Sequence, residues 1–278
     1  MPELPEVETM VRGIRRDCLN RTIDHVEFVR IARRPFPVSP NRQSVLKATA
    51  NRTIIDVSRL AKRILLTLDS GNCLVVEPRM TGLLLISDPP TLEHRRVVWH
   101  FQPETSKCDH LEFWDRRGLG TLSLLNPEGM NSLRSRLGPD ALAMTETDWA
   151  TRLKATSREI KVALLDQKLV AGIGNLYASE ILHRAGISPM RKSSTLTKKQ
   201  LQGLHEATQH ILNEAIRYEG STLGDGTYRN ALNKDGGYQN KHLVYQRAEE
   251  VCSKCGTGTI SRTVQAQRAT FFCPKCQR

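Results

Sequence analysis

The sequence predicts an α+β protein that combines an antiparallel sheet, a group of helices and a small terminal unit. Short runs of leucine and β-branched residues, separated by turn residues, occupy positions 22 to 125 and are typical of an antiparallel sheet. From 146 to 218 the apolar spacing becomes helical, with turns at 172–175 and 186–189. Four cysteines cluster near the end, which indicates a third, separate unit.

Length and charge limit the possible functions. A chain of 278 residues is long enough for about two domains that each bury a core. Its 41 lysines and arginines against 29 acidic residues give a net charge of +12, which favours a polyanionic partner, although basic proteins of other kinds exist. No apolar run is long enough for a membrane span and the start has no signal-peptide pattern, so a cytosolic protein is expected.

The opening MPELPEVET predicts the start of a helix and leaves one residue unexplained. Apolar residues recur at helical spacing from 6 to 18, and Pro5 and Glu6 suit a first helical turn. Pro2 lies outside this explanation. Because small residues after the initiator methionine permit its removal, we expect Met1 to be cleaved, which would leave the secondary amine of Pro2 as the first group of the chain.

The terminal cysteines have the spacing of a zinc site. They form two C-x2-C pairs seventeen residues apart: Cys252, Cys255, Cys273 and Cys276. This spacing predicts one structural zinc ion held by four thiolates, with a hairpin between the pairs. Disulfides are the alternative, and a reducing compartment disfavours them. Three isolated cysteines, Cys18, Cys73 and Cys108, are expected to be buried or inert thiols.

Three separated motifs together resemble the formamidopyrimidine-DNA glycosylase family. They are MPELPEVET, DQKLVAGIGNLYASEILHRAGISP at 166–189, and QRATFFCPKCQR at the end. The resemblance implies a β-sandwich flanked by helices over 1–136, a helix-two-turn-helix domain over 137–244 and a zinc finger over 245–278. It also implies a bifunctional DNA glycosylase and AP lyase that removes oxidised purines from damaged double-stranded DNA.

The same resemblance assigns chemical roles to the start of the chain. Pro2 corresponds to the family's nucleophile and Glu3 to its general acid/base, while Glu6 is expected either to position water or to stabilise the helix start. Lys62, at the start of a predicted strand, corresponds to a lysine that reaches the DNA and assists catalysis. Without the resemblance, each of these residues would be read as an ordinary helix-start or surface residue.

The DNA contacts also follow from the resemblance. The family fills the gap left by an extruded nucleotide from two loops, and it grips phosphates from the helical domain and the zinc finger. The gap-filling positions are Met80, Arg117 and Leu119, and the backbone contacts are Asn175, Tyr245 and Arg268. The glycine-rich segment 220–240 has weak periodicity; it predicts a mobile loop and corresponds to the family's lesion-capping loop.

Two departures from the family pattern bear on specificity. The sequence has Glu77-Pro78-Arg79-Met80 where HLGM is usual, so a carboxylate replaces a phosphate-binding histidine and Arg79 is the residue available to compensate. Leu119 replaces a phenylalanine that can stack on bases. We therefore expect weaker discrimination between the bases opposite the lesion than is normal in the family.

Two other interpretations stay open at this point. One is an oxidised-pyrimidine glycosylase of the endonuclease VIII branch, although PELPEVET fits that branch's PEGPE-type start less well. The other is a zinc-dependent DNA-binding protein without catalysis, which the retained Pro2, Glu3 and Lys62 disfavour. No motif indicates a dimer, so a monomer is expected.

Overall fold

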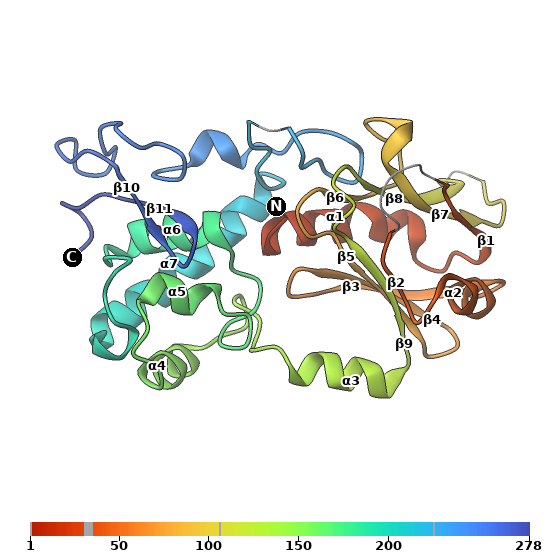
Figure 1. Ribbon diagram of the computed structural model, residues 1–278, viewed down its shortest axis with the longest axis horizontal. Coiled ribbons are helices and arrows are strands. Elements are labelled where there is room, and N and C mark those ends of the chain that lie inside the picture. Colours follow the sequence, from red (N-terminus) through yellow and green to blue (C-terminus); the bar gives the residue numbers. More distant parts are fainter. Residues whose placement is uncertain (1, 31–35, 106, 225) are drawn as a thin grey trace. The chain divides into compact units, whose positions relative to one another are not determined.

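The computed structural model describes residues 2–30, 36–105, 107–224 and 226–278, and it divides the chain into two compact units. The first unit comprises Met1–Ser135 together with Tyr218–Gln239. The second comprises Arg136–Arg217 and Asn240–Arg278. Each unit is therefore assembled from two stretches of chain, and the segment 218–239 belongs to the first unit rather than to the helices that precede it (Figure 1).

Two sheets form the body of the first unit. A four-stranded sheet has the order β1 (Ile23–Phe28), β7 (Arg95–Phe101), β8 (His110–Asp115) and β6 (Gly82–Leu85). A five-stranded sheet has the order β2 (Val38–Ser39), β9 (Thr121–Leu125), β5 (Cys73–Glu77), β4 (Arg63–Leu68) and β3 (Ile54–Leu60). Among the described strands every pairing is antiparallel except that of β2 with β9. The predicted antiparallel sheet is confirmed.

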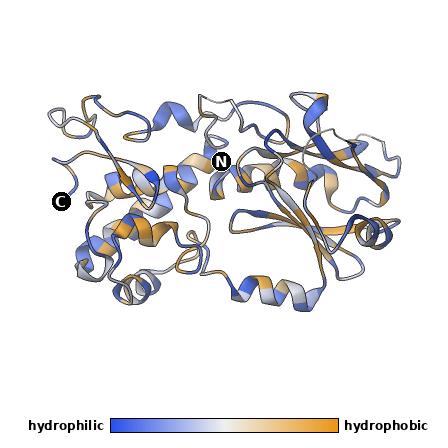
Figure 2. Ribbon diagram, in the orientation of Figure 1, coloured by the Kyte–Doolittle hydropathy of each residue, from blue (hydrophilic) through white to orange (hydrophobic). Residues whose placement is uncertain are grey.

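The two sheets and the first helix share one hydrophobic core. Leu66 and Val76 of the five-stranded sheet lie in the same buried cluster as Trp99 and Phe113 of the four-stranded sheet. Figure 2 shows hydrophobic residues along these strands. The sheets therefore pack as a sandwich, because each buries its apolar face against the other.

Helices flank the sandwich, as the resemblance implied. They are α1 (Leu4–Cys18), α2 (Arg42–Thr49), the short 3-10 turn η1 (Leu92–His94) and α3 (Pro127–Ser135). The face of α1 predicted to be apolar is buried, with Val7 and Ile14 fully inaccessible to solvent. Arg12 and Arg16 are on its exposed face. The amphipathic helix expected over 6–18 is confirmed, and it begins two residues earlier.

The glycine-rich segment is irregular but anchored, which differs from the mobile loop expected. Tyr228 and Ala231 are buried in the core of the sandwich. The backbone N–H of Ile86 donates to the carbonyl of Ala231 at 3.0 Å, and the Asn230 amide donates to Glu219 at 2.8 Å. Two apolar side chains and several hydrogen bonds thus hold the segment, a constraint that the sequence's weak periodicity did not reveal.

The second unit consists of helices and a two-stranded hairpin. Its helices are α4 (Glu146–Lys154), α5 (Ile160–Leu165), α6 (Asn175–Ala185) and α7 (Lys198–Arg217), with a 3-10 turn η2 (Ser193–Thr195). The hairpin is β10 (Ser261–Gln265) and β11 (Arg268–Phe272), and the 3-10 turn η3 (Tyr238–Lys241) spans the boundary with the first unit. The expected helical region and terminal hairpin are both confirmed. No helix among the described residues is long and apolar enough to cross a membrane.

Helix α1 approaches the segment 218–239 so closely that one glycine is required, which gives a stability prediction. A Cβ added at Gly13 would lie 2.6 Å from the Cβ of Ala231. We expect Gly13→Ala to lower the free energy of unfolding by about 1–3 kcal/mol because the core is overpacked. Gly203 in α7 has open space around its Cα, so Gly203→Ala should raise stability by up to about 1 kcal/mol through helix propensity. Urea denaturation of both variants tests this, and equal effects would contradict the close approach.

Candidate active site, DNA-contact loops and metal centre

Pro2 and Glu3 lie at the N-terminal end of α1. Glu3 is the residue that caps the helix, in an extended conformation with φ −106° and ψ −168°. Pro2 is buried, and Glu3 is only 3% exposed. The Glu3 carboxylate is therefore located at the positive end of the helix dipole, where negative charge is favoured. The amine candidate and the acid candidate are neighbours on a rigid element.

Glu6 connects this helix start to the segment 218–239. One of its carboxylate oxygens accepts from the backbone N–H of Glu3 at 2.9 Å, in a capping-box arrangement. The other accepts from the backbone N–H of Ser221, also at 2.9 Å. Of the two roles expected for Glu6, the structure shows the stabilisation of the helix start and adds a contact that no sequence pattern indicated.

Tyr228 and Gly220 close the space around Glu6. The Tyr228 hydroxyl donates to the carbonyl of Glu219 at 3.0 Å, and burial together with the nearby charge of Glu6 raises the pKa of this phenol well above its usual range. The phenol therefore stays a neutral hydrogen-bond donor. A Cβ at Gly220, where φ is +78°, would lie 3.0 Å from both Glu6 and Tyr228, so a side chain at this position would crowd both residues.

Lys62 lies in the turn between β3 and β4 rather than at the start of a strand. Leu60 pairs with Arg63, and the two residues between them form the turn. Arg59 braces this turn, because its Nη1 donates to the carbonyl of Ala61 at 3.0 Å and its Nε donates to Glu8 of α1 at 2.8 Å. The prediction of a strand start was thus wrong by one residue.

Glu8 of α1 accepts the hydrogen bond from Arg59 that holds the turn carrying Lys62 against the helix. Burial of this carboxylate opposes ionisation, but hydrogen bonds from Arg59 and Arg12 outweigh it and hold the pKa of Glu8 below its usual value. The carboxylate is therefore charged at neutral pH. Through Glu8 and Arg59, the helix that carries Pro2 and Glu3 also positions the turn that carries Lys62.

Asp115 organises the two loops that carry the gap-filling candidates. Its buried carboxylate accepts from the Thr81 hydroxyl at 2.5 Å, from the Arg117 N–H at 3.2 Å and from the Gly120 N–H at 2.8 Å. Thr81 follows Met80, and Leu119 precedes Gly120. The Asp115 carboxylate therefore fixes the backbone around Arg117 and Leu119, and it also fixes the end of the loop that carries Met80.

The gap-filling candidates themselves point toward solvent to different degrees. The Arg117 side chain is exposed, whereas Met80 and Leu119 are half-buried. All three belong to the first unit. The structure thus joins the two loops through Asp115 and leaves their side chains accessible to a ligand.

The unusual Glu77 is neutralised by arginines. Its carboxylate forms ion pairs with Arg63 and Arg79, each at 3.2 Å. Arg79 is exposed and has a φ of +54°, a left-handed conformation that is uncommon for a residue with a side chain. The repulsion that Glu77 would impose on a phosphate is therefore partly cancelled within the protein.

A buried lysine connects Asn175 to the zinc hairpin in the second unit. Lys161 is fully buried, and its ammonium donates to Asn175 Oδ1 at 2.8 Å, to the Ala269 carbonyl at 3.0 Å and to the Thr270 hydroxyl at 2.7 Å. Asn175 Nδ2 donates to the same Ala269 carbonyl at 3.0 Å. Asn175, the first residue of α6, is thus bonded to the residue that follows Arg268.

Tyr245 is held by a second buried charge of this unit. Glu180 of α6 is fully buried and accepts from the backbone N–H groups of Leu243, Val244 and Tyr245 at 2.8 to 3.0 Å. Burial raises the pKa of Glu180, and these three N–H groups oppose that effect. The ring of Tyr245 packs edge-on against Phe271 of β11 with centroids 5.3 Å apart, so its position depends on the hairpin.

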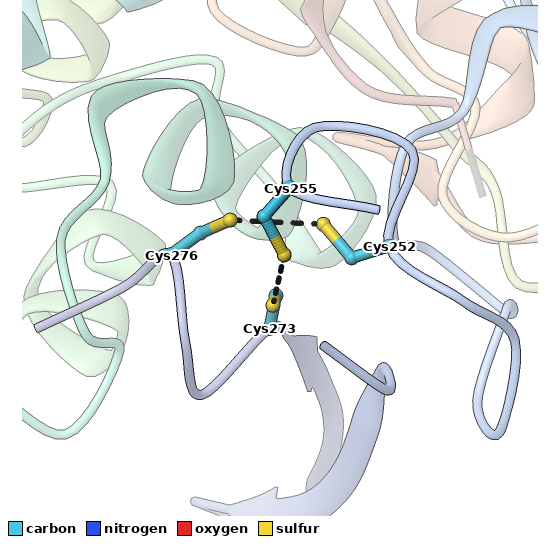
Figure 3. A group of neighbouring side chains, drawn as sticks. All are labelled: Cys252, Cys255, Cys273 and Cys276. Atoms are coloured by element: carbon cyan, nitrogen blue, oxygen red, sulfur yellow. Dashed lines mark hydrogen bonds between the residues drawn. The ribbon is translucent and has the colours of Figure 1, made fainter. Parts of the chain in front are cut away.

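The four terminal cysteines converge on one point (Figure 3). Their sulfur atoms all lie within 4.8 Å of one another. Backbone N–H groups of Thr257 and Gly258 lower the pKa of the Cys255 thiol to about 6, and burial with the adjacent thiols raises that of Cys276 to about 12. A cation bound by all four sulfurs would displace their protons and hold them as thiolates. The site is a structural zinc site, as predicted, because tetrahedral zinc prefers this ligand set.

The hairpin beyond the zinc site ends in a tight turn that presents Arg268. Gln265 pairs with Arg268, and the two turn residues, Ala266 and Gln267, have φ values of +45° and +60°. Positive φ at both positions is characteristic of a type I′ turn, which matches the twist of a hairpin. Arg268 is exposed beside this turn.

Three family models match this chain over almost its whole length. The formamidopyrimidine-DNA glycosylase N-terminal domain matches residues 1–122, and the H2TH domain of the same glycosylase matches residues 137–226. A zinc finger found in FPG and IleRS matches residues 249–278. The chain belongs to the formamidopyrimidine-DNA glycosylase family.

Relatives of this family align along the entire chain. A formamidopyrimidine-DNA glycosylase of Chloroflexus aggregans is 41% identical and one of Listeria monocytogenes is 38% identical, covering all of this chain and 98% and 100% of those proteins. The MutM (Fpg) structure from Thermus thermophilus has a TM-score of 0.85 at 35% identity, covering 99% and 98% of the two chains. A Lactococcus lactis Fpg complex with DNA containing an abasic site has a TM-score of 0.87 at 30% identity, covering 99% of each chain.

The family resemblance located the candidate contact residues but missed the residues that hold them. Asp115, Lys161 and Glu180 were not singled out, and each is a buried charge that receives or donates three hydrogen bonds. Asp115 had one sequence signal, because it ends a strand immediately before an Arg-Arg-Gly turn. Lys161 and Glu180 lie in ordinary helical patterns that gave none.

The central place of Asp115 gives a prediction about the loops of this family member. We expect Asp115→Asn to lower the free energy of unfolding by about 1–3 kcal/mol, because an amide nitrogen would face N–H donors and leave one of them unsatisfied. The exposed Asp109 is the matched control, and Asp109→Asn should change stability by less than about 0.5 kcal/mol. Thermal and urea denaturation measure both, and an unaltered stability of Asp115→Asn would show that the carboxylate does not organise the loops.

Proposed function

We propose that this protein is a bifunctional DNA glycosylase and AP lyase that excises oxidised purines, chiefly 8-oxoguanine and formamidopyrimidines. The observation that carries the proposal is the placement of Pro2 and Glu3 together at the buried start of α1, with Glu6 fixing that start. The membership of the family supports it. A binding protein without catalysis has no need of an amine and a carboxyl group in this arrangement.

The chemistry begins at the Pro2 nitrogen. Removal of Met1, which lies outside the described residues, would give Pro2 a secondary amine whose ordinary pKa of about 8 leaves a usable neutral fraction near pH 7. Attack of this amine on the sugar C1′ forms a C–N bond and breaks the bond from C1′ to the base, and the expelled base takes up the proton that the amine nitrogen loses. Glu3 protonates the ring oxygen so that the sugar opens.

The resulting iminium ion explains the second activity. A secondary amine gives an iminium that cannot lose its charge by deprotonation at nitrogen, so it withdraws electrons from the neighbouring carbon. The C2′ proton becomes acidic, and its loss breaks the C3′–O bond by β-elimination. A further δ-elimination releases the second phosphate. One covalent intermediate thus serves both base removal and strand cleavage.

Access to the base requires that the nucleotide leave the duplex. We assign the filling of the vacated space to Met80, Arg117 and Leu119, since apolar wedges offset the unstacking cost and an arginine can hydrogen-bond the partner base. Contacts to DNA phosphates are assigned to Lys62 in the first unit and to Asn175, Tyr245 and Arg268 in the second. The net charge of +12 supports these contacts.

Solved complexes of a related protein support the substrate class. Lactococcus lactis Fpg has been solved with DNA containing an abasic site and, as a mutant, with DNA containing Fapy-dG. We extend this substrate class to the present chain and propose that it acts in the cytoplasm as a monomer. A pyrimidine preference of the endonuclease VIII kind is the alternative that a comparison of lesions would detect.

Borohydride trapping on DNA containing 8-oxoguanine tests the proposed nucleophile and acid. The wild-type protein should form a covalent adduct, and Glu3→Gln should excise 8-oxoguanine about 10²–10⁴ times more slowly because ring-opening loses its acid. Asp17→Asn, at the other end of the same helix, is the matched control and should retain excision within about tenfold because Asp17 lies about 20 Å along the helix from its start. DNA binding by fluorescence anisotropy separates loss of chemistry from loss of affinity.

Two results of this experiment would reject parts of the proposal. Tight binding by the wild-type protein with no adduct on any oxidised lesion would indicate a DNA-binding protein without catalysis. An adduct that survives chemical blocking of the N-terminal amine would show that Pro2 is not the nucleophile.

The departures at positions 77, 79 and 119 give a prediction about the base opposite the lesion. We expect the rates of 8-oxoguanine excision opposite the four bases to differ by no more than about 150-fold, because a leucine cannot stack on a base and one hydrogen-bonded base contact accounts for about 1–3 kcal/mol. Leu119→Phe should widen the difference. Single-turnover rates with each opposite base test this, and a strong preference of the wild-type protein for cytosine would refute it.

A further inference from the structure

A buried histidine lies against the group of cysteines drawn in Figure 3. His183 belongs to the last turn of α6 and is fully buried. Its ring nitrogen Nε2 lies 3.4 Å from the sulfur of Cys252, which is also fully buried. Because sulfur is larger than oxygen, this separation is a hydrogen-bond distance. The cysteine spacing gave no indication of His183, which lies 69 residues before Cys252.

The surroundings of the ring indicate which nitrogen carries the proton. Among the described residues, Nδ1 of His183 is buried and has no hydrogen-bonding partner. A proton on Nδ1 would therefore be a buried donor without an acceptor, whereas a proton on Nε2 is donated to the Cys252 sulfur. The favoured form of the ring is the neutral one with its proton on Nε2.

Lys254 fixes the position of Cys252 relative to this histidine. It lies inside the first C-x2-C pair, and its ammonium donates to the carbonyls of His183 at 3.3 Å and Arg184 at 3.0 Å. Carbonyls in the last turn of a helix lack partners within the helix and favour a positive charge. The loop that carries Cys252 is thus attached to the same helical turn that carries His183.

The second cysteine pair is attached to the residues directly after α6. The side-chain amide of Gln277 donates to the Ile187 carbonyl at 2.9 Å and accepts from the backbone N–H of Cys273 at 2.8 Å. The backbone N–H of Arg278 donates to the Gly186 carbonyl at 3.2 Å. Both cysteine pairs are therefore held against the C-terminal end of α6, so the contact between His183 and Cys252 is a fixed feature of the second unit.

A donor to Cys252 meets a need that the zinc site creates. A zinc ion bound by four thiolates carries an excess of negative charge, and burial of Cys252 and Cys273 removes water that would solvate it. At Cys255 the backbone N–H of Gly258 donates to the sulfur at 3.2 Å. At Cys252 the imidazole of His183 supplies a donor from another element of the fold.

We propose that His183 is a positioning residue of the zinc site, whose Nε2–H donates to the Cys252 thiolate and thereby slows the loss of zinc. The hydrogen bond stabilises the thiolate against protonation, which competes with metal binding. It also fixes the direction of the sulfur, as partners of metal ligands commonly do. This role does not depend on the proposed glycosylase activity.

Zinc release from the full-length, zinc-loaded protein tests the role of His183. An excess of the chelator 4-(2-pyridylazo)resorcinol is added, and its absorbance reports the rate at which zinc leaves. His183→Phe keeps an aromatic ring but removes the donor, and it should release zinc at least about tenfold faster than the wild-type protein. His183→Gln supplies an amide N–H near the position of Nε2, so it should release zinc more slowly than His183→Phe.

His205 of α7 provides the matched control. It belongs to the same unit, and its Nδ1 is likewise buried without a partner among the residues that the structure describes. His205→Phe should therefore release zinc at the wild-type rate. Circular dichroism of each zinc-loaded variant verifies that the helices are retained.

Two spectroscopic measurements separate the hydrogen bond from a packing role. In the cobalt-substituted protein, His183→Phe should move the thiolate-to-cobalt charge-transfer band to lower energy, because the Cys252 sulfur loses a donor that stabilises its lone pairs. His205→Phe should leave the band in place. In the wild-type protein with nitrogen-15-labelled histidine, long-range nitrogen–proton correlations should locate the His183 proton on Nε2.

Three results would each overturn the proposal. They are release of zinc from His183→Phe at the wild-type rate, equal acceleration of release in His183→Phe and His183→Gln, and a His183 proton located on Nδ1. The last measurement uses the wild-type protein, so it decides the matter even when a variant fails to fold.

Discussion

The Glu6 carboxylate is the constraint on which the N-terminal site depends. It is 3% exposed and accepts one hydrogen bond from Glu3 and one from Ser221. The first fixes the helix start next to Pro2, and the second fixes a segment that returns to the first unit after the helices of the second. Without this carboxylate, two buried N–H groups would lose their partner, at a cost of about 1–3 kcal/mol each. Glu6 thus connects the helix start next to the candidate nucleophile with Ser221, which lies more than two hundred positions later in the sequence.

Buried charged side chains fix the backbone at other candidate sites of the chain as well. Asp115 fixes the loops of the gap-filling candidates, and Lys161 and Glu180 fix Asn175, the hairpin and Tyr245 within the second unit. Each is a buried charge with three hydrogen-bonding partners, so its desolvation is offset by directed bonds. Loops that must meet a ligand need accessible side chains on a rigid backbone, and buried charges supply that rigidity without covering the side chains.

Whether a feature could be predicted from the sequence depends on how far apart its interacting residues lie along the chain. Helix α1 was predictable because its apolar spacing is local. The zinc site was predictable because four cysteines at this spacing are compatible with few other structures. The anchoring of the segment 218–239 was not predictable, because Tyr228 and Ala231 bury themselves against strands distant in sequence. Lys161 was missed for the same reason, since its acceptors Ala269 and Thr270 come more than a hundred residues later. A family resemblance adds positions but not these contacts.

The orientation of Arg268 shows how several such constraints combine. Zinc fixes the base of the hairpin, because the last ligand pair begins directly after β11. Lys161 fixes β11 close to the tip through the backbone of Ala269. At the tip, Ala266 and Gln267 adopt left-handed conformations that cost about 1–2 kcal/mol for each such residue. Glycine or asparagine at these two positions would relieve that strain. The chain has alanine and glutamine instead, in a turn directly before the exposed Arg268. The pairing of β10 with β11 up to the turn, the zinc ligands after β11 and the Lys161 contacts to β11 together hold the tip in this geometry.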